Sequence, residues 1–277
     1  MSYKIVGDSC CDYTNIEKNK NVYVQIPLTL DVDGVQIKDD DAFNQQEFLE
    51  RVAKSKDCPR SACPAPEEYM RAYEDADDIY VVTLSSELSG SYNSAVLAKK
   101  LYEEEHGQKN IHIFNSKSAS AGQLLICRLI EELVESGLSF SEVITKVESY
   151  IEGLDTYFVL ETLDFLRKNG RLSRVQALLA SALNIKPVMG AENGTIIKLL
   201  QARGMNKAVS AMIDTAIARC KHTEQKNLII VHCNCLERAK KAKEEIEQKA
   251  NFKSVDIVDA RGVSSLYAGD GGIIIAC

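Results

Sequence analysis

The sequence contains no apolar run of the roughly 18 residues that a membrane-spanning helix requires. Its amino-terminal segment, MSYKIVGDSC, lacks the basic residues and apolar core of a secretion signal. Internal repeats, low-complexity tracts and long linkers are also absent. We therefore expect a folded protein without a membrane span that acts in the cytoplasm.

The chain also lacks an excess of positively charged residues. The chain carries 33 Lys and Arg residues against 40 Asp and Glu residues, which gives a net charge of −7 and a pI near 5.3. Binding to a nucleic-acid backbone needs clustered basic residues on one face. Segment 236–250 mixes both signs at helical spacing and is expected to be a solvated helix face. No nucleic-acid partner is expected.

The nine cysteines follow neither a disulfide framework nor a metal-binding pattern. Their number is odd, they are scattered along the chain, and no pair has C-x2-C spacing. We expect reduced thiols in a reducing compartment, and neither a metal nor a cofactor. The cysteines that lie near one another in sequence are Cys10 with Cys11, Cys58 with Cys63, and Cys233 with Cys235.

Length and patterning predict two α/β domains. A hydrophobic fraction of 45% over 277 residues is enough to fill two cores. In the first half, short β-branched runs alternate with longer amphipathic segments, which is typical of a parallel sheet with crossover helices. The expected strands are 3–9, 22–30, 79–85 and 110–116, and the expected helices include 91–105, 119–135 and 140–153.

Beyond about residue 155 the pattern changes. The tripeptide Glu192-Asn193-Gly194 lies between two apolar runs, and Asn-Gly readily takes the positive φ angles of a hairpin turn. The second half is expected to contain a mixed or antiparallel sheet. We therefore predict a first domain over 1–156, a second over 157–277 and a ligand site between them.

The stretch TLSSELSG (83–90) marks a candidate ligand site. It follows an expected buried strand and precedes a helix, which places Ser89 and Gly90 at the helix start. In open α/β sheets ligands bind at this edge, and the free amides and dipole of a helix start favour an anion. A serine at this position is also commonly no more than a helix cap.

A nucleophilic serine is the alternative interpretation of this stretch. The chain contains neither a G-x-S-x-G elbow nor an S-x-x-K pair. A triad remains formally possible because its members converge only in space. Of the four histidines, His112 and His232 fall in expected strands. His106 and His222 fall at solvated helix ends.

Several other residues are candidates for a ligand site. The segment from Asp8 to Asp12 closes the first strand, although bonding within its own turn is an equally good interpretation. Ser61 projects from a proline-held loop. Arg171 lies between an expected helix end and the next helix start, and Arg203 ends a strand; each is a plausible carboxylate or phosphate partner or a structural salt bridge.

Taken together, long segments of the chain resemble the DegV family of bacterial fatty-acid-binding proteins. The resemblance runs nearly from end to end. The segments that carry it are DSCCD (8–12), LSSELSGSYNSA (84–95), NSKSASAG (115–122), LETLDFLRKNGRLS (160–173), IKPVM (185–189) and the closing glycine loop (267–272).

The resemblance implies a long-chain fatty acid held in an interdomain tunnel, for lipid transport or for presentation to a separate fatty acid kinase. Ser89 with the Gly90 backbone, together with Ser61, matches the groups that bind the carboxylate. Arg171 and Arg203 match basic residues near the head group or the kinase-docking face. The list of candidate ligand residues is completed by Tyr267, in the closing loop.

Two positions depart from the family pattern. The family's glutamine in the loop after Ser61 is Cys63 here, and a family histidine is Tyr267. A tyrosine hydroxyl still suits carboxylate binding, whereas engagement of a kinase is put in question. We predict a lipid-binding protein with no catalytic residue. The alternatives are a serine hydrolase of acyl esters, using Ser89 or Ser86, and a binder of a small phosphorylated metabolite.

Overall fold

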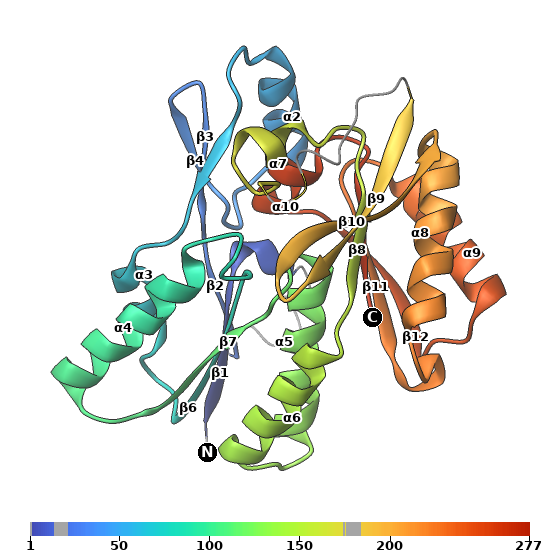
Figure 1. Cartoon of the computed structure of the whole chain (residues 1–277). Helices are drawn as coiled ribbons and strands as arrows, with labels where there is room; N and C mark the ends of the chain where they lie inside the picture. Colours follow the sequence, from blue (N-terminus) through green and yellow to red (C-terminus); the bar gives the residue numbers. More distant parts are fainter. Residues whose placement is uncertain (1, 14–21, 174, 176–183) are drawn as a thin grey trace.

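Two large sheets and one small one make up the molecule (Figure 1). The computed structural model describes residues 2–13, 22–173, 175 and 184–277. The first large sheet is formed by the first half of the chain and the second by the second half. The predicted helix after Ser173 lies outside the described residues.

The first large sheet is fully parallel, as the alternating pattern predicts. Its strand order is β2-β1-β6-β7. The four strands are β1 (Tyr3–Asp8), β2 (Tyr23–Ile26), β6 (Asp78–Thr83) and β7 (Asn110–Asn115). Its helices are α3 (Pro66–Ala72) and α4 (Ser91–His106), which share one apolar cluster, and α5 (Ala121–Glu135) and α6 (Phe140–Glu152), which share another.

The prediction of a single strand over 22–30 was wrong. The chain forms β2 up to Ile26 and then β3 (Thr29–Val32), and the two strands belong to different sheets. Pro27 lies between them, and proline has no N–H to continue a ladder. With β4 (Val35–Lys38) and β5 (Arg60–Ala62), β3 forms a small antiparallel sheet that the sequence pattern did not predict.

The second large sheet is mixed, in the order β10-β9-β8-β13-β11-β12. The predicted hairpin is confirmed: β9 and β10 pair antiparallel, and Asn193 and Gly194 have φ angles of 48° and 78°. The strands are β8 (Thr156–Val159), β9 (Ile185–Glu192), β10 (Thr195–Arg203), β11 (Asn227–His232), β12 (Ser254–Asp259) and β13 (Ile273–Ala276). The helices α8 (Met205–Arg219) and α9 (Leu236–Lys249) pack on it.

Helix α5 joins the two large sheets. It contacts β1 and β6 of the parallel sheet and also β11 and β13 of the mixed sheet. Buried residues from both sheets, such as Val82 and Val231, therefore belong to one apolar cluster with Ile126 of α5. The amino end of α5 is placed where the edges of the two sheets meet.

Three short elements close this region from above in Figure 1: α2 (Gln45–Lys54), α7 (Asp164–Lys168) and α10 (Gly262–Ala268). The prediction that Tyr267 lies in a loop was wrong, because Tyr267 lies on α10. The amino end of α10 is fixed by Asp39, whose carboxylate accepts the amides of Gly262 and Val263 at 2.8 and 2.9 Å.

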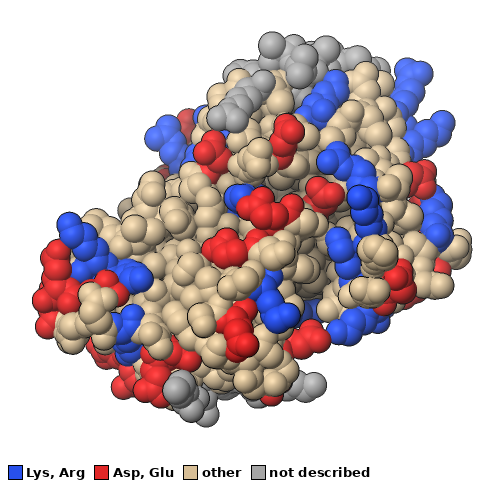
Figure 2. Space-filling model, turned by 60° about the horizontal axis from the view of Figure 1, so that its bottom comes forward, with Lys and Arg blue, Asp and Glu red and all other residues tan. Residues whose placement is uncertain are grey.

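The surface carries charges of both signs. Figure 2 shows one face on which basic side chains gather toward one side, with acidic side chains among them. Exposed ion pairs such as Lys253 with Glu132 (3.2 Å) are common, and each contributes little to stability. Among the described helices, none is both long and apolar enough to cross a bilayer.

Gly122 in the first turn of α5 is required by close packing. A Cβ atom there would lie 2.0 Å from the Ser118 Oγ and 3.0 Å from the Thr156 Oγ1. In most helix positions alanine is more stable than glycine, but here the added Cβ would clash.

Gly122→Ala is therefore expected to lower the free energy of unfolding by about 1–3 kcal/mol. Urea denaturation measures this change. The control is Gly153→Ala, because its nearest atom would be 3.8 Å away; equal effects of the two changes would contradict the packing argument.

Candidate functional site

The carboxyl ends of three parallel strands meet at one edge. The segments that follow β1, β6 and β7 begin at Ser9, Leu84 and Ser116, and they reach α10 and the amino end of α5. Asp8 joins two of these segments, because its carboxylate accepts the amides of Leu84 (2.7 Å) and Cys10 (3.3 Å). Of the two interpretations offered for Asp8, bonding within the turns is the one observed.

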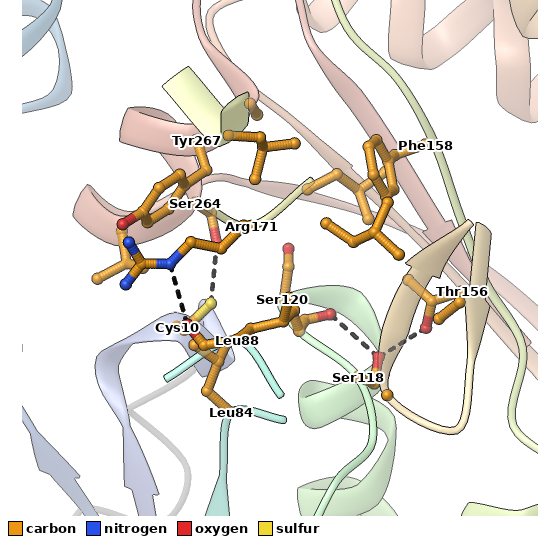
Figure 3. Close-up of a pocket in the computed structure, with 18 of the residues that line it drawn as sticks. Cys10, Leu84, Leu88, Ser118, Ser120, Thr156, Phe158, Arg171, Ser264 and Tyr267 are labelled. Atoms are coloured by element: carbon orange, nitrogen blue, oxygen red, sulfur yellow. Dashed lines mark hydrogen bonds between the residues drawn. The ribbon is translucent and has the colours of Figure 1, made fainter. Parts of the chain in front are cut away.

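An apolar cavity of about 90 Å³ lies between this edge and the mixed sheet. Figure 3 shows Arg171 and Tyr267 at one end, Phe158 and Thr156 at the other, and Ser120 between them. The segments that follow β1, β6 and β7, strands of the mixed sheet, and α10 contribute to the wall. The main apolar lining residues are Leu84, Leu88, Phe158, Leu160, Leu166, Ile196, Val263 and Ile274.

Polar groups gather at the Tyr267 end of the cavity. The Tyr267 hydroxyl lies 2.8 Å from the Ser61 Oγ, and the Arg171 guanidinium stacks over the Tyr267 ring at 5.5 Å. The Arg171 Nε donates to the Leu88 carbonyl at 3.1 Å. Burial raises the pKa of Tyr267, against the opposing effects of Ser61 and Arg171, so the phenol is a neutral donor. We call Ser61, Arg171 and Tyr267 the mouth.

Ser89 and Gly90 lie beside the mouth but do not line the cavity. The N-cap residue of α4 is Gly90, and the Oγ of the preceding Ser89 accepts a hydrogen bond from the Ser91 amide at 3.2 Å. Gly90 packs against Cys63, whose Sγ would lie 2.9 Å from an added Cβ. The loop that follows Ser61 thus contacts the start of α4.

Arg203 is separate from the other candidates. It ends β10 opposite Ile185, is exposed and does not line the cavity. The structure therefore brings Ser61, Arg171 and Tyr267 together, places Ser89 and Gly90 next to them, and leaves Arg203 apart.

Among the histidines and cysteines of the described residues, Cys10 alone lines the cavity. No histidine lines it; His232 is buried in β11, and burial lowers its pKa. All nine cysteines are free. Within the described ranges, no group of three or more His, Cys, Asp or Glu residues could hold a metal ion.

A buried carboxylate lies next to the cavity, in the candidate segment from Asp8 to Asp12. Asp12 is fully buried, and its Oδ2 accepts hydrogen bonds from Ser120 (2.5 Å) and Ser264 (2.6 Å), which both line the cavity. Its Oδ1 accepts the Arg261 amide at 2.6 Å. Burial raises the pKa of Asp12 to about 7, although these hydrogen bonds oppose the shift.

This arrangement defines a two-sheet α/β protein with an apolar site at the sheet edge. A family model described as "Uncharacterised protein, DegV family" matches residues 2–277. A DegV domain-containing protein of Streptococcus pneumoniae is 34% identical over 278 residues, which cover 99% of this chain and 98% of that protein. The chain belongs to the DegV family.

Solved structures agree with this assignment. A DegV family protein of Ruminococcus gnavus, with vaccenic acid, has a TM-score of 0.97 and 49% identity and covers 100% of both chains. The fatty acid kinase (Fak) B3 protein of S. pneumoniae, loaded with linoleic acid, has a TM-score of 0.91 and 33% identity, and the match covers 100% of this chain and 99% of that one. The expected α/β fold with one parallel and one mixed sheet is confirmed.

The Asp12 carboxyl is expected to titrate near pH 7, about three units above an ordinary aspartate. Because its folded pKa lies above the unfolded value, its contribution to stability is full below about pH 4 and is lost as the pH rises to about 7. Carbon-13 NMR of the carboxyl carbons measures the pKa. Asp164 is the reference, since Arg167 lowers its pKa. An Asp12 pKa near 4 would contradict this account of its burial.

Proposed function

We propose that the protein binds one long-chain fatty acid, with the acyl chain in the cavity and the carboxylate at the mouth, between the segments 1–156 and 157–277. The observation that carries this proposal is an apolar cavity with the Arg171 guanidinium and the Tyr267 hydroxyl at one end, where the Ser61 hydroxyl is bonded to Tyr267. The fatty acids in the related solved structures support it. We place this function in the cytoplasm.

The hydrocarbon chain dominates the binding energy. About fifteen methylenes, each worth about 0.8 kcal/mol when buried, supply on the order of 12 kcal/mol before ordering costs. The cavity of about 90 Å³ is smaller than the cavity of about 150 Å³ that accepts benzene. A long acyl chain therefore enters only as lining side chains move outward, and part of the transfer energy offsets this rearrangement.

The mouth then fixes the orientation of the ligand. Arg171 supplies the positive charge, and Tyr267 and Ser61 supply hydroxyl donors to a carboxylate. Ser89 and the Gly90 backbone extend this donor set at the start of α4, where the helix dipole favours an anion. The exposed Arg203 fits a docking face better than the head-group site.

Presentation of the bound acid to a fatty acid kinase is the second part of the proposal. Its support is the likeness to the Fak B3 protein. Cys63 and Tyr267 lie close to the proposed head group, so both departures from the family pattern bear on how a kinase would reach the carboxylate.

The two alternative functions, ester hydrolysis by Ser86 or Ser89 and binding of a small phosphorylated metabolite, have less support at the mouth. The Ser86 Oγ accepts the Asn115 amide nitrogen at 2.8 Å and the Ser89 Oγ bonds to Ser91. Among the hydrogen bonds described for these two serines, none involves a histidine or carboxylate base. The predominantly apolar lining disfavours a small phosphorylated metabolite. We therefore propose a carrier function at the mouth, without catalysis there.

Protein purified from cells grown with fatty acids is expected to carry one of them. Mass spectrometry of organic extracts would show a long-chain fatty acid at close to one mole per mole of protein. The native mass spectrum of the same sample provides the stoichiometry. Extracts free of acyl chains, with no binding on addition of oleate, would argue against the proposal.

Arg171→Gln is expected to weaken fatty-acid binding by about 10- to 100-fold, because a charge-assisted hydrogen bond is worth about 1.5–3 kcal/mol. Displacement of a fluorescent fatty acid measures the change. The matched control is Arg167→Gln, since Arg167 is a neighbouring arginine whose guanidinium pairs with Asp164 outside the cavity. Equal affinities for wild type and Arg171→Gln would remove this residue from the head-group site.

A further inference from the structure

Ser120 has a backbone conformation that L-residues rarely adopt. It stands between β7 and α5 with φ 55° and ψ −118°, directly before the first helical residue, Ala121. Such a conformation costs on the order of 1–3 kcal/mol and persists only where the surrounding structure imposes it. Strain of this kind is concentrated at functional sites, so a role for the side chain is worth seeking.

The local sequence matches the steric pattern of a nucleophile elbow. In G-x-S-x-G the serine sits on a strained strand-to-helix turn, and small neighbours permit the tight turn. The segment 118–122 reads S-A-S-A-G, with a serine replacing only the first glycine. The tight turn also brings Ser118 close to Gly122, where an added Cβ would lie 2.0 Å from the Ser118 Oγ. Glycine at the last position of the motif is therefore required by packing.

A base is already bonded to this serine. The Ser120 Oγ donates to the Asp12 Oδ2 at 2.5 Å. Asp12 is oriented in turn by the Ser264 hydroxyl and the Arg261 amide. The Arg261 guanidinium lies near other carboxylates, those of Asp39 and Asp41, at 3.9 and 3.7 Å. Asp12 is thus held by neutral donors that leave it basic.

The pair faces a volume suited to an acyl chain. Ser120 lines the apolar cavity (Figure 3), whereas its partner Asp12 is fully buried and is not among the lining residues. The cavity lies at the amino end of α5, because the residues directly before the helix, Ser118 to Ser120, line it. In the first turn of the helix, the Gly122 and Leu124 amides donate to the carbonyls of Ala119 and Ser120. In a nucleophile elbow the amide after the serine, here that of Ala121, stabilises the oxyanion.

We propose that Ser120 is a nucleophile toward acyl esters whose chain occupies this cavity, with Asp12 as its general base. The Ser120 Oγ forms a bond to the ester carbon while its proton passes to the Asp12 Oδ2. The bond from that carbon to the alcohol oxygen breaks, and the alcohol leaves with the proton. Water then attacks the acyl-serine, Asp12 relays its proton to the Ser120 Oγ, and a fatty acid is released into the cavity.

This activity goes beyond the proposed function and uses a different part of the same cavity. The mouth residues Ser61, Arg171 and Tyr267 hold the carboxylate of a free acid, while Ser120 would act on the carbonyl of an ester. A fatty acid is the ligand of one process and the product of the other. The two proposals can therefore fail separately.

The reaction is expected to depend on pH through Asp12, since only its carboxylate accepts the proton. Among the described residues, the other ionisable groups around it are Asp39, the guanidinium of Arg261, and the thiols of Cys10 and Cys233. Burial raises the pKa of both thiols, so they stay neutral. The rate should rise as the pH passes about 7 and then level off.

A long-alkyl fluorophosphonate tests the proposal on the full-length protein. Attack by the Ser120 Oγ on phosphorus expels fluoride and leaves a stable adduct, which intact-mass spectrometry and peptide mapping locate. We expect a single adduct on Ser120, a rate that follows the pH dependence above, and a loss of rate of at least about 100-fold in Asp12→Asn. Labelling elsewhere, or none at all, would overturn the proposal.

Ser120→Gly is the decisive variant. Glycine adopts the observed φ and ψ without strain, so this variant should fold while losing all labelling. The control Ser141→Ala removes an exposed serine from α6 and should label like the wild type. Undiminished labelling of Ser120→Gly would refute the assignment even if Asp12→Asn does not fold. Loss of fatty acid from wild type and Ser120→Gly alike would count against the binding function only.

Discussion

The region around the cavity depends on a buried carboxylate, that of Asp12, which is held by uncharged hydrogen-bond donors. Asp12 follows β1, and it receives hydrogen bonds from the turn before α5 and from the start of α10, through Ser120, Ser264 and the Arg261 amide. A second carboxylate, that of Asp39, binds the next two amides of α10. Because unpaired buried donors and charges are costly, these segments are constrained to one arrangement.

That arrangement determines both ends of the cavity. Fixing the start of α10 places Tyr267 over Arg171 and beside Ser61, which forms the polar mouth. Fixing the turn before α5 places Ser120 on the wall. The head-group site and the strained serine are thus consequences of the same buried hydrogen bonds, although we assign them different chemistry.

Much of the fold could be predicted from the sequence because its signals are local. Buried parallel strands are continuous apolar runs, and the dipeptide Asn193-Gly194 favours a hairpin turn through its local conformational preference. The small antiparallel sheet was missed because Pro27 divides one apolar run between two sheets. Helix α10 was missed because its seven residues end at a glycine-rich segment that suggests a loop.

The candidate site was predictable only where a motif marks it. Ser61 and Arg171 were candidates from their local sequence, Tyr267 came from the family resemblance, and the contacts among the three could not be inferred from spacing. Asp12 and its partners lie 108 and 252 residues apart in the chain, so no local pattern joins them. The signals available for Ser120 were its place in the segment NSKSASAG (115–122) and the S-x-S-x-G spacing at 118–122.

A crystal structure of the protein with its co-purified ligand tests the central claim most directly. The account predicts continuous density for an acyl chain that starts between Ser61, Arg171 and Tyr267 and runs past Leu88 toward Phe158, with the lining side chains displaced outward. A cavity that stays closed and empty while a bound acid occupies another part of the surface would contradict it.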